Sequence, residues 1–302
     1  MEGFLLIDKP AGMTSFDVVR RVRRATGCRK IGHGGTLDPM ATGLLPLALG
    51  RGTRLLEYLS DGDKAYLATV MLGVTTDTLD AEGEVLERKP VPCFDREQIE
   101  SACEFFRGQI EQVPPMYSAL KHQGQPLYKL ARSGRSVERA ARQVTIHRLE
   151  VDLLELPTLE LSIACSKGTY IRTLAADLGD NLGTGAHLTA LRRTEHGPFR
   201  IEAAIGLEDV EDHDWSLPFS GLLPLTMAFA GWPRVELDGD AKERLRQGIP
   251  PTLEQIRLPA EIEPGTRVVL LTGEPLFATA RFEPERPQEK RGDFKLLKVF
   301  HP

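Results

Sequence analysis

The sequence predicts a mixed α/β chain of the α+β kind with two domains, residues 1–230 and 231–302. Stretches of period-2 alternation and stretches of helical spacing follow one another irregularly, and no unit of 20–50 residues repeats. The 302 residues exceed the usual size of one domain. Hydrophobic residues make up 41% of the chain and charged residues 27%, which excludes a fibrous repeat and wholesale disorder.

The first elements expected are a buried strand and a capped helix. The apolar run at residues 4–7 is too short for a signal peptide and predicts a strand. Thr14 and Asp17 have the spacing of a capping box, and apolar residues then recur at helical spacing as far as Gly27. We therefore expect a short amphipathic helix between Thr14 and Gly27.

Strands and helices continue through the middle of the chain. Alternation over 64–72 predicts a strand with both faces partly covered, and residues 96–106 are expected to form a helix. Two further strands, 144–156 and 159–165, are joined at Pro157-Thr158. Helical spacing resumes at Ile171, so a further helix is expected there.

Composition changes near residue 202, which marks the approach to a domain boundary. The acidic residues between 202 and 214 stand without a Lys or Arg, and residues 215–233 carry no charge but contain several Pro and Gly. Helix breakers at this density predict a connection between domains and not a membrane span. Short apolar runs at 268–271 and 296–300 then indicate a small β-rich module.

The cysteines point to a reduced, cytoplasmic protein. The chain has four, Cys28, Cys93, Cys103 and Cys165, and they form neither a C-x-x-C pair nor a dense disulfide framework.

Local charge opposes the formal net charge of −5. Residues 20–30 contain six basic residues and no acidic one, and residues 121–148 contain seven against Glu138 alone. Tyr117 and Tyr128 lie close to the second run. Basic surfaces attract phosphates and aromatic rings stack on unpaired bases, so RNA is favoured over a small metabolite as the ligand. A solvated helix face is the alternative explanation of either run.

Residues 30–46, K-I-G-H-G-G-T-L-D-P-M-A-T-G-L-L-P, form the densest local motif. Its glycines permit close approach of a backbone or ligand, and Pro39 biases Asp38 towards an extended conformation, so Asp38 is expected on a loop. The glycines match neither a Rossmann fingerprint nor a P-loop, which removes support for a nucleotide cofactor. His33 has no partner at metal-ligand spacing, so no metal site is expected. Taken alone, an Asp before Pro is typical of a turn.

The motif is similar to the signature of the TruB family of tRNA pseudouridine synthases, which modify the T-loop uridine of tRNA. Further segments are similar to family motifs and follow one another in the same order: residues 8–15 (DKPAGMTS), 64–66 (KAY) with Gly73, 76–83 (TDTLDAEG), 115–121 (PMYSALK) and 165–172 (CSKGTYIR). The resemblance covers about residues 3–200, and the basic insert at about 117–145 favours the bacterial form.

The resemblance implies a catalytic site built on Asp38. Asp38 would be the catalytic aspartate, Tyr66 the ring that stacks on the target uracil, and Arg172 the ion-pair partner of Asp38. The implied reaction breaks the N1–C1′ bond, rotates the uracil and forms a C5–C1′ bond, with no cofactor and no metal. A carboxylate beside a guanidinium stays ionised at neutral pH, as this chemistry requires. Whether Asp38 attacks C1′, attacks the base or removes a sugar proton stays open.

Three more residues would form the substrate-binding walls. Tyr170 and Leu191 would line the pocket, and His33 would help to hold the T-loop near the displaced nucleotide. Each site residue taken alone also fits core packing, a turn or a surface helix. Asp80 and Asp177 are alternative carboxylates, of which Asp80 is expected to brace a neighbouring loop.

The resemblance also implies the architecture and the partner. It predicts a mixed, largely antiparallel sheet with the active cleft across its middle, followed by a small PUA-like RNA-binding domain. The partner would be the T-arm of tRNA, bound by a monomer without a membrane or a protein partner, and a role in tRNA folding is open.

Other functions remain possible at this point. An RNA-binding or RNA-folding factor with a silent pocket would also explain the basic runs. A two-carboxylate glycosidase would need a second carboxyl roughly 5–9.5 Å from Asp38. The catalytic subunit of a guide-RNA particle is the alternative within the family, and the basic insert speaks against it.

Overall fold

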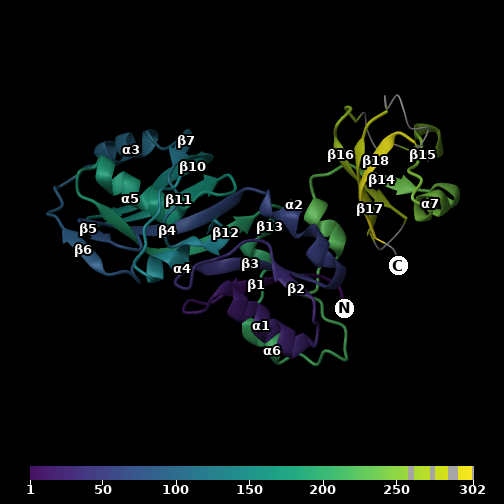
Figure 1. The fold of residues 1–302 in the computed structure, drawn as a ribbon, viewed down its shortest axis with the longest axis horizontal. Coiled ribbons are helices and arrows are strands. Elements are labelled where there is room, and N and C mark those ends of the chain that lie inside the picture. Colours follow the sequence, from purple (N-terminus) through teal and green to yellow (C-terminus); the bar gives the residue numbers. More distant parts are fainter. Residues whose placement is uncertain (258–261, 273–275, 285–291, 301–302) are drawn as a thin grey trace.

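The computed structural model describes residues 1–257, 262–272, 276–284 and 292–300 (Figure 1). Its larger sheet has the strand order β1-β3-β12-β4-β11-β10-β7, with β2 paired to β3 and β13 paired to β12. The strands are β1 (Gly3–Lys9), β2 (Ile31–His33), β3 (Thr42–Leu49), β4 (Lys64–Leu72), β7 (Gly108–Gln112), β10 (Arg142–Glu155), β11 (Thr158–Cys165), β12 (Ala186–His196) and β13 (Phe199–Arg200). The β12–β3 pair is parallel, whereas the other pairs of this sheet are antiparallel. The predicted mixed, largely antiparallel sheet is confirmed.

Helix α1 (Ser15–Thr26) forms where the capping pattern predicts it. The Thr14 hydroxyl accepts a hydrogen bond from the backbone N–H of Asp17, whose carboxylate accepts one from the N–H of Thr14. Gly27 ends the helix with a left-handed φ of 67°, a conformation that glycine adopts without strain. Because Val18 and Val22 are fully buried, the apolar face of α1 packs into the core below the loop that carries Asp38.

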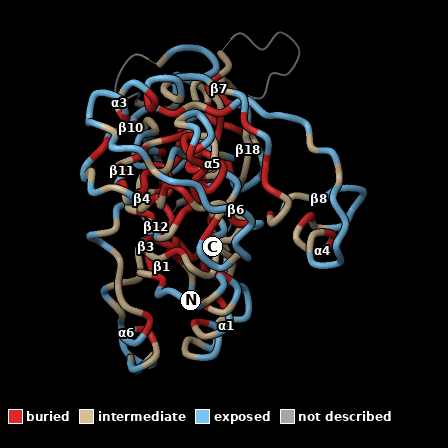
Figure 2. Tube along the Cα trace, turned by 90° about the vertical axis from the view of Figure 1, so that its left-hand side faces the viewer, coloured by how far each residue is buried: buried red, intermediate tan, exposed pale blue. Residues whose placement is uncertain are grey.

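Two longer helices pack with the strands of the larger sheet. Helix α3 (Arg96–Glu104) ends two residues earlier than the sequence predicts, and α5 (Ile171–Asn181) begins where helical spacing resumes. Ile99 of α3 and Leu174 and Leu178 of α5 belong to the same apolar cluster as the central strands. Figure 2 shows this buried interior beneath an exposed outer surface. The core therefore fixes the start of α5, where the predicted site residues Tyr170 and Arg172 lie.

Short elements project from this body. The basic insert forms a small hairpin of β8 (Lys121–His122) and β9 (Gln125–Pro126), followed by helix α4 (Leu127–Arg132), and Figure 2 shows β8 and α4 standing out from the sheet. A second hairpin pairs β5 (Val74–Thr76) with β6 (Val85–Arg88). Helix α2 (Leu56–Ser60) follows the 3-10 turn η1 (Gly50–Leu55), and α6 (Leu207–Glu211) contacts α1 through an ion pair of Arg21 with Glu211.

The segment predicted as a connection runs back along the first strand. The backbone N–H of Phe4 donates to the carbonyl of Leu223 at 2.9 Å, and Leu223 returns a bond to Phe4 at 2.8 Å. A 3-10 turn, η3 (Leu225–Phe229), follows. No helix among the described residues combines the length and apolarity needed to cross a bilayer.

A five-stranded sheet makes up the C-terminal part, which confirms the predicted β-rich module. Its order is β15 (Ile256–Arg257), β14 (Arg234–Leu237), β16 (Arg267–Leu271), β17 (Leu276–Phe282) and β18 (Phe294–Val299), and helix α7 (Gly239–Arg246) packs against β14. This sheet has its own apolar cluster, but Val269 and Phe300 pack instead with Phe4 and Phe229. The division at residue 230 stays a prediction, because the cluster that contains Phe4, Phe229, Val269 and Phe300 joins residues on both sides of it.

Candidate active site

A cavity of about 370 Å³ opens over the middle of the larger sheet. Its walls are the loop 34–38 and the segments 118–120 and 168–172, and strands β4 and β12 supply the side chains between them. Of the predicted site residues, the cavity lining brings together Asp38, Tyr66, Tyr170, Arg172 and Leu191. His33 lies outside it and lines an adjoining groove of about 870 Å³ that also reaches Asp38 and Arg172.

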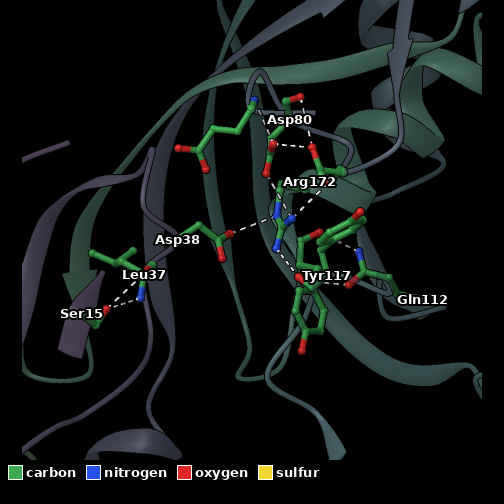
Figure 3. A network of polar contacts seen from close by, with 10 residues as sticks. Ser15, Leu37, Asp38, Asp80, Gln112, Tyr117 and Arg172 are labelled. Atoms are coloured by element: carbon green, nitrogen blue, oxygen red, sulfur yellow. Dashed lines mark hydrogen bonds and ion pairs between the residues drawn. The ribbon is translucent and has the colours of Figure 1, made fainter. Parts of the chain in front are cut away.

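Asp38 lies on the loop between β2 and β3, as its neighbour Pro39 predicts. The hydroxyl of the buried Ser15 accepts from the N–H of Leu37 at 2.8 Å and donates to the Leu37 carbonyl at 3.1 Å (Figure 3). On the other side of Asp38, the N–H of Gly12 donates to the Pro39 carbonyl at 2.9 Å. These bonds tie the loop to the start of α1, so the Asp38 carboxylate is held in place at the cavity edge.

Arg172 bridges two carboxylates. Its Nε lies 3.0 Å from Oδ2 of Asp38, and one terminal nitrogen lies 3.1 Å from Oδ2 of Asp80 (Figure 3). The guanidinium also donates to the carbonyls of Thr78 at 3.0 Å and Tyr117 at 2.8 Å. Because its side chain is 6% exposed, the alternative of a surface helix residue is wrong for Arg172.

The charge of Asp38 depends on this arrangement. Burial raises the pKa of Asp38, the Arg172 guanidinium opposes this rise, and the nearby Asp80 carboxylate adds to it. Removing the guanidinium would therefore leave a desolvated carboxyl beside a like charge and would favour its protonated form. The ionised state of Asp38 is maintained mainly by Arg172.

The two alternative carboxylates have different positions. Asp80 accepts from the hydroxyl of Thr78 at 2.6 Å and from the N–H of Glu82 at 3.1 Å, so it braces its own loop as well as Arg172. Asp177 is half-buried on α5, where burial raises its pKa to about 6, but it lines neither the cavity nor the adjoining groove.

The aromatic and apolar walls come from three elements. Tyr66 on β4 is buried, and because burial raises its pKa the phenol is neutral at physiological pH. Leu191 on β12 is 8% exposed and faces the same cavity. Tyr170, just before α5, is fixed through its backbone: its N–H donates to the Gln112 side chain at 2.8 Å and its carbonyl accepts at 3.1 Å.

His33 occupies the groove beside the loop that carries Asp38. Burial lowers its pKa and the Arg193 charge adds to this effect, so the ring is neutral at physiological pH. The same groove is lined by Phe16 and by Tyr117, Tyr128 and Arg132 of the basic insert. The groove therefore combines aromatic rings and the Arg132 cation with the acidic residues Asp77, Glu82 and Glu84. No group of three or more His, Cys, Asp or Glu is placed to hold a metal ion among the residues that the structure describes.

Sequence reasoning missed three residues of the site. Arg193 and Lys64 line the cavity, and Gln112 fixes Tyr170 from β7. A signal existed for Arg193, because residues two apart on a strand share a face and Leu191 was already expected in the pocket. No local signal marks Gln112, whose partner is 58 residues away.

Comparison with known proteins gives relatives along the whole chain. The family model described as TruB family pseudouridylate synthase (N terminal domain) matches residues 23–171, and that described as tRNA pseudouridylate synthase B C-terminal domain matches residues 172–229. A protein named tRNA pseudouridine synthase B from Syntrophotalea carbinolica is 44% identical over 301 residues, which span 100% of this chain and 98% of that protein. One of the same name from Ectopseudomonas mendocina is 56% identical over 70% of this chain and 69% of its own.

Solved structures show the same fold. A Cbf5-Nop10-Gar1 complex contains a chain with a TM-score of 0.76 and 29% identity, covering 99% of this chain and 85% of that one. A chain in an H/ACA RNP bound to a substrate RNA containing 2′-deoxyuridine has the same TM-score and coverage with 27% identity.

Proposed function

The chain belongs to the TruB family of pseudouridylate synthases, and from this premise we propose that it converts the T-loop uridine of tRNA, position 55 by tRNA convention, to pseudouridine. The observation that carries the proposal is the Asp38 carboxylate, held by Arg172 at the edge of a cavity whose wall is the Tyr66 ring. In this proposal Asp38 acts on the target nucleotide and Tyr66 stacks on its base.

The cavity suits a nucleotide taken out of its stack. Extruding a base costs a few kcal/mol, and contacts made by the extruded nucleotide must offset that cost. Tyr66, Tyr170 and Leu191 supply aromatic and apolar surface for the base, while Asp38 lies where the ribose would enter. Enclosure also retains the detached uracil, which must rejoin the sugar and not diffuse away.

The proposed reaction balances without a co-reactant. The N1–C1′ bond breaks, a C5–C1′ bond forms, the proton on C5 is lost and N1 gains one. No electrons or atoms enter or leave, so the side chains of the cavity supply what the isomerisation needs.

The surface around the cavity suits RNA. His33 of the adjoining groove would contact the T-loop near the displaced nucleotide. The exposed basic residues Arg23 and Arg24 at the end of α1 and Arg132 at the end of α4 can neutralise phosphates. We propose that residues 231–302 add a further RNA contact and that the enzyme acts as a cytoplasmic monomer on the T-arm, without a protein partner.

The test is conversion of an unmodified tRNA transcript by wild type, Asp38→Asn and Asp177→Asn. Wild type and Asp177→Asn are expected to form pseudouridine at the T-loop position, because Asp177 lines neither the cavity nor the groove. Asp38→Asn is expected to form none while still binding the transcript. Equal conversion by Asp38→Asn, or none by wild type, contradicts the proposal.

The same reaction separates the other functions. A glycosidase would give a hydrolysed product, and Asp80, the carboxyl that shares Arg172 with Asp38, is committed to that guanidinium at 4% side-chain exposure. A catalytically silent RNA-folding factor would bind the transcript with a steep salt dependence but leave every uridine intact. Because the mixture contains only protein and tRNA, conversion also excludes a need for guide RNA.

A further inference from the structure

Arg193 is a buried cation beside the Tyr66 ring. It is 1% exposed and has the largest volume of the fully buried residues that the structure describes. In the antiparallel pairing of β12 with β4, Arg193 stands directly opposite Tyr66, and both side chains line the cavity. The Arg193 guanidinium therefore lies at the same cavity wall as the Tyr66 ring, on which the substrate base is proposed to stack.

The bonds of Arg193 are made with neutral groups. Its Nε donates to the carbonyl of Leu44 at 2.7 Å, and a terminal nitrogen donates to the carbonyl of Gly35 at 3.1 Å. No carboxylate of the described residues forms an ion pair with it. A buried charge without a counter-charge costs several kcal/mol, so its presence at a reaction site calls for an anionic partner that arrives with the substrate.

The two sides of the cavity differ in charge. On one side Arg172 is balanced by Asp38 and Asp80. On the other side Lys64 adds a second cation, whose Nζ donates to the carbonyls of Ser60, at 2.8 Å, and Gly62. The wall around Tyr66 is therefore electropositive before substrate binds.

The proposed reaction places a negative charge at this wall. If Asp38 attacks C1′ or removes a sugar proton, the electron pair of the N1–C1′ bond leaves with the base, which becomes a uracil anion. If Asp38 attacks C6 of the base instead, the new O–C6 bond displaces the C5–C6 π electron pair onto the conjugated C4 carbonyl oxygen while the N1–C1′ bond is still intact. The charge disappears when the C5–C1′ bond has formed, the C5 proton has left and N1 has gained a proton. Every route therefore passes through an anionic base.

We propose that Arg193 is a catalytic residue that stabilises the negative charge on the uracil between cleavage of N1–C1′ and formation of C5–C1′. This inference rests on the proposed function and assigns the stabilising group that the Asp38 network does not supply. The guanidinium is held by Leu44 and Gly35 before substrate arrives, so it needs no reorganisation at the moment of reaction. Removal of one such preorganised donor typically costs about 10²–10³ in rate.

The test compares two leaving bases in the full-length enzyme. T-arm stem-loop RNAs carry either uridine or 5-fluorouridine at the target position, and single-turnover rates of N1–C1′ cleavage are measured for wild type, Arg193→Gln, Arg193→Lys and Arg192→Gln. Fluorine withdraws electrons and stabilises the base anion on its own, so 5-fluorouridine depends less on a protein cation. Arg192, the next residue on β12, is the matched control, because it is half exposed and pairs with Asp8.

Arg193→Gln is expected to lose about 10²–10³ in rate on uridine and clearly less on 5-fluorouridine, which changes the ratio of the two rates about tenfold. Arg193→Lys keeps the charge and is expected to keep the wild-type ratio, and Arg192→Gln to keep both rates. The ratio is measured within one protein preparation, so a partly unfolded variant does not alter it.

Equal losses on the two substrates for Arg193→Gln would overturn the inference and make Arg193 a structural support of Tyr66. A changed ratio of the uridine rate to the 5-fluorouridine rate in Arg193→Lys would also overturn the inference. This ratio can still be measured if Arg193→Gln does not fold. Failure of wild type to cleave either RNA would instead refute the proposed function, so the two failures are distinguishable.

Discussion

Substitution of Arg172 by glutamine tests how strongly the site depends on one buried guanidinium. The side chains of Arg172 and Asp80 are 6% and 4% exposed, and that of Asp38 is 35% exposed. Arg172→Gln leaves the Asp80 carboxylate buried without its cation, and breaking such a pair from one side costs about 3–5 kcal/mol. The more exposed Asp38 contributes less to this loss, because water can solvate part of its charge.

The assay is the free energy of unfolding, measured by chemical denaturation for Arg172→Gln, Asp80→Asn and the double variant. Because the two residues share one network, the double variant should lose less than the sum of the single losses, by about 0.5–3 kcal/mol. Arg192→Gln breaks an exposed ion pair with Asp8 and should cost at most about 1 kcal/mol. Additive losses, or a loss for Arg172→Gln no larger than that of the control, would contradict a shared Arg172–Asp80 network.

Three further predictions concern the pH dependence of stability, the pH dependence of the reaction rate and the hydrogen bonds that fix Tyr170. Burial lowers the pKa of His196 to about 2, below its unfolded value of about 6.5. The contribution of the neutral ring to the free energy of unfolding is therefore complete above pH 6.5 and falls by about 2 kcal/mol on acidification to pH 5. Chemical denaturation at a series of pH values should show this fall, and His196→Gln should lack it. Burial raises the pKa of Asp38 and Arg172 opposes this rise, so the single-turnover rate should increase with pH as Asp38 ionises. Arg172→Gln should move this increase in rate to higher pH. An increase at the same pH in both proteins would argue against Asp38 as the titrating group. Gln112→Met removes two hydrogen bonds to the backbone of Tyr170 and should lower the free energy of unfolding by about 1–3 kcal/mol. Gln143 is exposed, so Gln143→Met should lower it little. Equal effects of the two substitutions would contradict a role of Gln112 in fixing Tyr170.

Much of the fold follows from local patterns. The capping pair Thr14 and Asp17, with Gly27 at the far end, determines α1 because each bond it needs lies within a few residues. Alternation over Lys64–Leu72 predicts β4 for the same reason. Asp38 was predicted on a loop from the neighbouring glycines and from Pro39, since proline restricts the residue before it. Elements governed by neighbours in sequence are therefore predicted well.

The assembled site depends on contacts that sequence spacing does not encode. Arg172 meets Asp80 across 92 residues and Gln112 meets Tyr170 across 58. Likewise, the burial of Arg193 results from the pairing of β12 with β4. Its spacing from Leu191 indicates the cavity face of the strand, but that spacing does not predict that Arg193 is 1% exposed while the half-exposed Arg192 pairs with Asp8. The resemblance to a family gave the positions of the proposed site residues, but the charge balance around them required the structure.

The most direct measurement is a crystal structure of the enzyme with T-arm RNA that carries 5-fluorouridine at the target position. We expect an extruded nucleotide with its base against Tyr66 and a ribose carbon at most about 3.5 Å from the Asp38 carboxylate. A target nucleotide that remains stacked in its loop, or a ribose bound away from Asp38, would contradict it.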